Sequence, residues 1–151
     1  MFVRPSLVAL AVASLLVAPP LAAQANRADS IRTAGQIDAA GKLAEARAIY
    51  QALIATAPDA AAKAAATRRL AMSYGYDGNC AKVIELEEQV IAYWQTRRAA
   101  EPQNAHYQEG EMANEAARVC IDHGFLDEAE KMYKRGTALG IIGPNGAGKS
   151  T

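Results

Sequence analysis

The residues that could do chemistry most directly lie at the end of the chain, in residues 143–151. The phosphate-binding pattern G-x-x-x-x-G-K-[ST] is matched there by Gly143, Gly148, Lys149 and Ser150. In such a loop, backbone N–H groups surround the phosphates, the lysine reaches the outer ones, and the serine hydroxyl binds Mg²⁺. The helix that the loop opens adds its free N–H groups and its dipole. Taken alone, these four residues indicate nucleotide binding.

The run resembles the Walker A loop of ABC-type ATPases, and that resemblance implies further parts. The helix that should start near Lys149 has three residues in this sequence, and residues 139–142 are a short candidate strand without a partner strand. The magnesium-binding Asp of a Walker B strand and an LSGGQ-like signature are not found. We therefore expect residues 140–151 to be a disordered, truncated or fused tail with no functional nucleotide site and no bound ATP. The alternative is a truncated fragment of a nucleotide-binding ABC-type ATPase.

The N-terminal residues 1–25 have the pattern of a secretory signal peptide. Arg4 supplies the positive charge, and residues 7–17 form an apolar run that is shorter than the roughly 20 residues needed to span a bilayer. Small residues before the expected cleavage site follow, and we place cleavage after Ala25. The sequence thus predicts a periplasmic or secreted protein, away from the cytoplasmic ATP pool. An uncleaved membrane anchor is the alternative.

Composition excludes some classes of partner. The chain has 16 basic and 16 acidic residues and no basic block, so its charge does not indicate binding to nucleic acid. It also lacks the polybasic amphipathic helix that binds membrane surfaces. His106 and His123 are not spaced as metal ligands, and no cofactor is expected.

Cys80 and Cys120 are the only cysteines. In a reducing compartment they would be small core residues, whereas export permits a disulfide. Packing of neighbouring antiparallel helices would bring the two positions together, so the pair is our candidate for a bridge.

Three glycines, Gly41, Gly78 and Gly124, mark a repeat. An alanine lies seven residues before each glycine: Ala34, Ala71 and Ala117. A small residue lies five residues after each glycine: Ala46, Val83 and Ala129. A larger residue lies nine residues after each glycine: Tyr50, Glu87 and Tyr133. Small residues on both sides of a turn let two antiparallel helices approach closely, and glycine can take the left-handed conformation that ends the first helix. The sequence therefore predicts three helical hairpins.

This pattern resembles the tetratricopeptide repeat (TPR) family over about residues 27–139. The resemblance implies an all-α domain, residues 26–139, of antiparallel hairpins stacked as a TPR-like solenoid. Glu87 departs from it, because the family prefers an aromatic residue at that position. A generic alanine-rich helical bundle is the alternative. We expect a long helix over about residues 81–100, a loop over residues 101–105, and no strand before residue 139.

In stacked hairpins the first helices line a concave face that usually binds the partner. Positions ten, six and two before each turn glycine share that face: Arg68, Met72 and Tyr76; Asn114, Arg118 and Asp122; Ile31, Gly35 and Ala39. The polar members of the second and third sets could clamp a carboxylate or the backbone of an extended peptide. A solvated polar face without a partner is the alternative.

No arrangement of catalytic residues is predicted. The acid pairs Glu87–Glu88 and Glu109–Glu111 are expected on polar helix faces without a buried partner that would shift their pKa values. The sequence thus favours an exported scaffold that binds a protein or peptide and has no catalytic activity. The third hairpin carries the apolar residues Phe125, Leu126, Met132 and Tyr133 without a following capping helix, and we expect these residues to promote self-association.

Overall fold

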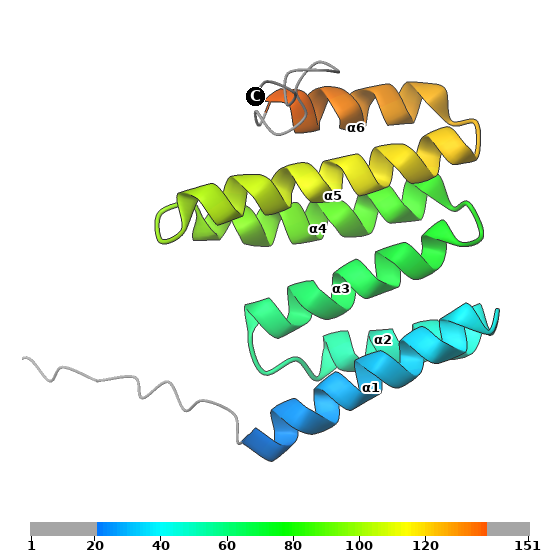
Figure 1. Cartoon of the computed structure of the whole chain (residues 1–151), viewed down its shortest axis with the longest axis vertical. Coiled ribbons are helices and arrows are strands. Elements are labelled where there is room, and N and C mark those ends of the chain that lie inside the picture. The colour runs from blue at the N-terminus through cyan, green and yellow to red at the C-terminus, as the bar shows by residue number, and fades with distance from the viewer. Residues whose placement is uncertain (1–20, 139–151) are drawn as a thin grey trace, which may run out of the picture.

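A computed structural model describes residues 21–138, and within that range it contains six α-helices and no strand. The helices are α1 (Leu21–Ala39), α2 (Leu43–Ala55), α3 (Ala60–Gly75), α4 (Cys80–Arg97), α5 (Pro102–Asp122) and α6 (Leu126–Ala138) (Figure 1). The all-α prediction is confirmed for these residues. Most of the expected signal peptide and the whole Gly143–Ser150 loop lie outside the described residues.

Each helix packs against the next one in the sequence. Figure 1 shows them as a row in which successive helices run in opposite directions, with α1 and α2 at one end and α6 at the other. Because of this order, α3, α4 and α5 are consecutive in space as well as in sequence. None of the described helices has the length and hydropathy that crossing a membrane requires.

The predicted turn glycines adopt the left-handed conformation. Their φ angles are 78° at Gly41, 72° at Gly78 and 81° at Gly124. The small residues predicted around each turn are at most 2% exposed: Ala34, Ala46, Ala71, Val83, Ala117 and Ala129. Both parts of the repeat prediction are confirmed, because the paired helices meet through side chains that are small enough for close packing.

The predicted loop over residues 101–105 is wrong, because α5 already begins at Pro102. Proline is tolerated in the first turn of a helix, where its missing N–H has no intrahelical partner to lose. Side-chain caps mark the first turns of two other helices. The Asp59 carboxylate accepts a hydrogen bond of 2.7 Å from the Ala62 N–H at the start of α3, and Asn79 caps α4 in the same way.

A polar cluster ties α1, α2 and α3 together. The Ser73 hydroxyl donates to the buried Asp38 carboxylate at 2.8 Å, and the Arg47 guanidinium donates to the Ser73 carbonyl at 2.7 Å. Arg47 also pairs with Asp77 at 2.9 Å and lies 4.0 Å from the ring centroid of Tyr74. The otherwise costly burial of the Asp38 carboxylate is thus compensated in part by the Ser73 hydroxyl of α3.

Cys80 and Cys120 form a disulfide in the structure, with their Cα atoms 5.0 Å apart. The bridge joins the first residue of α4 to the last turn of α5, and it is buried against Ala129 of α6. It therefore connects the second and third hairpins at the end of the molecule where Gly78 and Gly124 turn the chain.

The apolar residues expected to be exposed at the third hairpin divide into two groups. Phe125 and Leu126 are 46% and 65% exposed, and Tyr133 is 40% exposed. Met132 is buried in the core with Met112, so its expected exposure is wrong: it faces α5 instead of solvent. Self-association through this end of the chain stays a prediction.

Substituting two of the turn glycines should separate backbone strain from steric overlap. Gly41→Ala places a side chain in open space, so we expect only the left-handed penalty of about 1–2 kcal/mol. A Cβ at Gly78 would lie 2.4 Å from Nδ1 of His123, so Gly78→Ala should lower the free energy of unfolding by about 1 kcal/mol more than Gly41→Ala does. Urea unfolding measures both, and adding His123→Ala should cancel the surplus. Equal costs at the two turns would contradict this arrangement.

Removing the bridge should also lower stability. The disulfide closes a segment of 40 residues, which corresponds to about 4 kcal/mol in the chain-entropy model. The double variant Cys80→Ala/Cys120→Ala should therefore unfold at a clearly lower urea concentration than the oxidised wild type. Reduced wild-type protein serves as the control without a mutation. Identical midpoints for all three samples would show that the bridge does not stabilise the fold.

Candidate functional site

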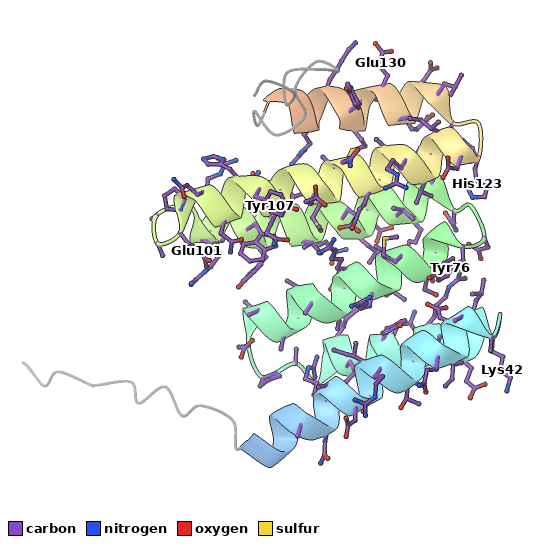
Figure 2. All side chains as sticks on the ribbon, viewed as in Figure 1. Lys42, Tyr76, Glu101, Tyr107, His123 and Glu130 are labelled. Atoms are coloured by element: carbon purple, nitrogen blue, oxygen red, sulfur yellow. A yellow bond between two sulfur atoms is a disulfide. The ribbon has the colours of Figure 1, made fainter. Side chains whose placement is uncertain are left out.

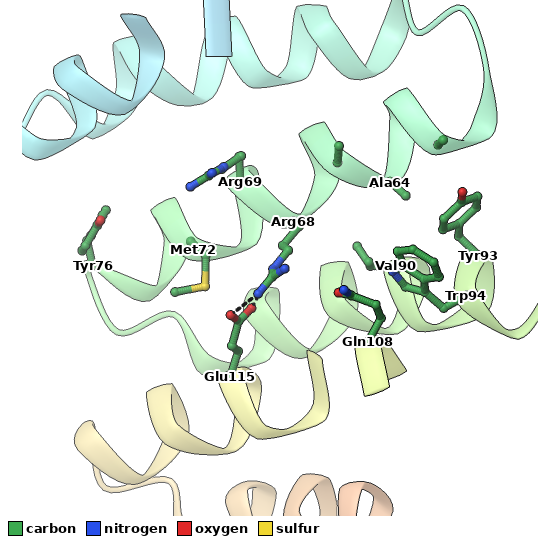
Figure 3. Close-up of a pocket in the computed structure, with 12 residues that line it drawn as sticks. Ala64, Arg68, Arg69, Met72, Tyr76, Val90, Tyr93, Trp94, Gln108 and Glu115 are labelled. Atoms are coloured by element: carbon green, nitrogen blue, oxygen red, sulfur yellow. Dashed lines mark hydrogen bonds and ion pairs between the residues drawn. The ribbon is translucent and has the colours of Figure 1, made fainter. Parts of the chain in front are cut away.

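A groove with a volume of about 630 Å³ opens among α3, α4 and α5 (Figure 3). Its lining combines small, aromatic and charged side chains from all three helices: Ala61, Ala64, Ala65, Arg68, Arg69, Met72 and Tyr76 from α3 and its C-cap; Val90, Tyr93 and Trp94 from α4; Gln108 and Glu115 from α5. Figure 3 shows the Arg68–Glu115 pair near the middle, with Tyr76 toward one end and Trp94 toward the other.

Helical spacing explains why these residues share the groove. Arg68, Met72 and Tyr76 recur at four-residue steps, which places them on one face at the C-terminal half of α3. The N-terminal half of that face carries alanines, whose short side chains leave the groove open there. On α4, Val90 and Trp94 are again four residues apart, and the Trp94 ring packs edge-on against Tyr93 with a centroid distance of 5.1 Å.

A salt bridge between α3 and α5 crosses the groove. Arg68 Nε donates to Glu115 Oε2 at 3.0 Å, and Arg68 Nη2 contacts the other carboxylate oxygen, so the pair is bidentate. The two side chains are 36% and 21% exposed, which places the pair at the boundary between core and solvent. Hydrogen bonding to Glu115 raises the pKa of the Arg68 guanidinium above its ordinary value. Arg68 is therefore already neutralised by a partner within the chain.

Glu87 is a buried acid near this salt bridge. It lies three residues before Val90 on α4, is 0% exposed, and neither of its carboxyl oxygens has a hydrogen-bond partner among the described residues. Burial, with a smaller contribution from the negative charge of Glu115, raises the pKa of Glu87 to about 8, although Arg68 acts in the opposite direction. The expectation that Glu87 lies on a polar face is wrong. The TPR-like pattern itself places that position in the core, where the carboxyl group is uncharged at neutral pH.

Glu109 is buried as well, which corrects a second expectation. Unlike Glu87, it has a partner: Arg98 Nε donates to Glu109 Oε1 at 2.7 Å. The remaining members of the two acid pairs are partly exposed, and Glu88 pairs with Arg135 of α6 at 2.7 Å. Thus α4 and α5 each bury one glutamate, and only the one on α4 lacks a donor.

The predicted binding face is only partly brought together. Arg68, Met72 and Tyr76 line the groove, whereas Asn114 and Arg118 of α5 lie outside its lining, and Arg118 is exposed. The first-hairpin set and Asp122 also lie outside it. Sequence reasoning missed the α4 aromatic residues together with Gln108 and Glu115. The four-residue spacing of Val90 and Trp94 was a usable signal, but the pairing of Arg68 with Glu115 spans 47 residues and depends on the tertiary packing.

The groove has no metal-binding arrangement. Within residues 21–138, no group of three or more His, Cys, Asp or Glu side chains is placed to hold a metal ion. His123 follows α5 as its C-cap residue, and its ring lies beside the Gly78 turn instead of the groove.

Comparisons with protein-family models, curated proteins and solved structures found no match to this chain.

Glu87 should make stability depend on pH. A glutamate ionises near pH 4.5 in the unfolded chain, whereas burial raises the pKa of folded Glu87 to about 8. Between these values the unfolded state binds fewer protons, so Glu87 lowers the free energy of unfolding as the pH rises from 4.5 to 8. Glu87→Gln removes this loss. The free energy of unfolding of this variant, relative to that of the wild type, should therefore increase by roughly 3 kcal/mol between pH 5 and pH 8.

Urea unfolding at several pH values measures this difference. Glu85→Gln is the matched control, because Glu85 lies on the same helix but is exposed and pairs only with Lys82. The free energy of unfolding of Glu85→Gln should change with pH in the same way as that of the wild type. If the free energy of unfolding of Glu87→Gln also followed the wild type, Glu87 would be ionised in the folded protein.

Proposed function

We propose that this chain is an exported helical-repeat scaffold, similar to TPR proteins, whose groove binds a segment of a protein or peptide without catalysing a reaction. The groove among α3, α4 and α5 is the observation that carries the proposal. A concave surface formed by successive helical hairpins is the usual binding surface of repeat proteins. The three glycine turns and their buried small residues support the family resemblance.

The dimensions of the groove suit a short peptide. Its α3 lining extends from Ala61 to Tyr76, which corresponds to about 22 Å at 1.5 Å per helical residue. An extended peptide advances about 3.3 Å per residue, so roughly seven residues would fill this length. The alanines and Val90 offer an apolar floor, and the Gln108 amide can exchange hydrogen bonds with a peptide backbone.

Filling the groove should abolish binding. Ala65 is exposed and lines the groove, so Ala65→Trp inserts a bulky ring without disturbing the core. Heptapeptides selected from a random display library on the oxidised wild-type protein should bind Ala65→Trp at least ten times more weakly in fluorescence anisotropy. Ala48→Trp on α2 is the matched control, because Ala48 is also exposed but lies outside the groove lining, and it should bind normally. Failure to select any peptide that is sensitive to Ala65→Trp would overturn the proposal.

The rival function is nucleotide binding through the Gly143–Ser150 loop. We propose that this chain does not bind ATP, because the resemblance to an ATPase is limited to the loop letters and no strand occurs in residues 21–138 to support a nucleotide-binding sheet. Calorimetric titration of the chain with Mg-ATP should give the same trace for wild type and Lys149→Ala. A micromolar isotherm that requires Lys149 would favour the rival.

A further inference from the structure

We propose that the groove recognises an acidic side chain of its peptide, aspartate or glutamate, which pairs with the Arg69 guanidinium. This inference rests on the peptide-binding function proposed above and names the chemistry of the guest. It starts from the three charged residues of the groove lining, Arg68, Arg69 and Glu115. Of these, only Arg69 has no ion pair or side-chain hydrogen bond with another described residue.

The charge of the groove favours an anionic guest. Arg68 and Glu115 neutralise each other through a bidentate salt bridge, which leaves the single positive charge of Arg69. A guest carboxylate can accept hydrogen bonds from the Arg69 guanidinium while the Arg68–Glu115 pair stays intact. A guest cation would be repelled by Arg69 and would have to displace Arg68 to reach Glu115. Glu111, one turn before Glu115 on α5, lies outside the lining.

Arg69 lies near the middle of the groove, which favours a side chain of the peptide over its terminus. The two ends of the α3 lining, Ala61 and Tyr76, are about 12 Å and about 10 Å from Arg69 along the helix. Each distance matches roughly three to four residues of an extended peptide. A heptapeptide that fills the groove therefore places its central residue beside Arg69. A terminal carboxylate at this position would leave half of the groove empty.

The two ends of the groove favour apolar residues on either side of the acid. Tyr93 and Trp94 line one end, and Met72 and Tyr76 line the other (Figure 3). Apolar guest side chains that cover these surfaces supply most of the binding free energy. Arg69 is exposed, so its ion pair with the guest stays in contact with solvent and contributes modestly, chiefly to specificity.

The test uses heptapeptides selected from a random display library on the oxidised protein at low ionic strength, and keeps those whose binding is lost in Ala65→Trp. They should share an aspartate or glutamate near the centre and an apolar residue toward each end. In fluorescence anisotropy, replacing that acid by asparagine or glutamine should weaken binding about fivefold, as expected for an exposed ion pair. Raising NaCl from about 20 mM to about 300 mM should weaken the acidic peptide more than its amide counterpart.

Variants of the protein test the same pair from the other side. Arg69→Gln should weaken the acidic peptide by the same factor and bring no further loss for the amide peptide. Arg69→Glu should bind a peptide with lysine in place of the acid more tightly than the acidic peptide. Lys63→Gln is the matched control, because Lys63 is an exposed cation of α3 outside the groove lining, and it should bind as wild type does. Circular dichroism checks that each variant is folded.

The outcomes separate this inference from the proposed function. Groove-dependent peptides that lack an acid, or equal losses in Arg69→Gln and Lys63→Gln, would overturn the pairing with Arg69 but leave peptide binding in place. Loss of affinity on amidation of the peptide C-terminus, without an effect of replacing the acidic side chain, would assign the carboxylate to the terminus and also overturn the inference. Absence of any groove-dependent peptide would overturn both proposals together.

Discussion

The interaction on which the site depends is one guanidinium placed near two carboxyl groups. Arg68 of α3 pairs with Glu115 of α5, and Glu87 of α4 is buried next to this pair without a hydrogen-bond donor of its own. Both partners in the bidentate pair remain partly exposed, whereas Glu87 is fully enclosed. A buried acid without a donor is favoured only in its neutral form. The electrostatics of the groove therefore depend on the Arg68–Glu115 pair and on the protonation of the buried Glu87 carboxyl.

The fold creates this arrangement through the close approach of consecutive helices. Left-handed glycines reverse the chain, and buried alanines at the hairpin contacts bring α3, α4 and α5 within side-chain reach of one another. The Cys80–Cys120 bridge fixes the α4 and α5 ends near the turns, while the polar cluster around Ser73 attaches α3 to the first hairpin. The groove lies between the disulfide and the polar cluster, and both hold the helices that line it in position.

The elements that local sequence determines were predictable. Gly41, Gly78 and Gly124 mark turns because few other residues adopt a positive φ, and the fixed spacing to small residues identifies the hairpin contacts. Proline misled the prediction at Pro102, since the same residue that ends helices also starts them. The repeat register already placed Glu87 where a core aromatic is expected, but the charge of the residue suggested solvent. That conflict between position and residue type was the available signal for a buried acid.

The rest of the site could not be read from the sequence. The Arg68–Glu115 pair connects residues that are 47 apart, and the choice of Arg98 as the partner of Glu109 follows from the short link between α4 and α5. The α5 part of the predicted face lies outside the groove, and α4 supplies an aromatic wall instead. Which face of a helix lines a groove depends on its angle to its neighbours, which periodicity alone does not determine.

The most direct measurement for this account is a pH titration of the glutamate side-chain carboxyl carbons by ¹³C NMR in the oxidised protein. The account predicts one resonance with a midpoint near pH 8, which is absent from the Glu87→Gln variant, as expected for the carboxyl whose pKa is raised to about 8 by burial. If every glutamate carboxyl titrated below pH 6, Glu87 would be ionised at neutral pH. The account of Glu87 as a buried, neutral acid near the Arg68–Glu115 pair would then be contradicted.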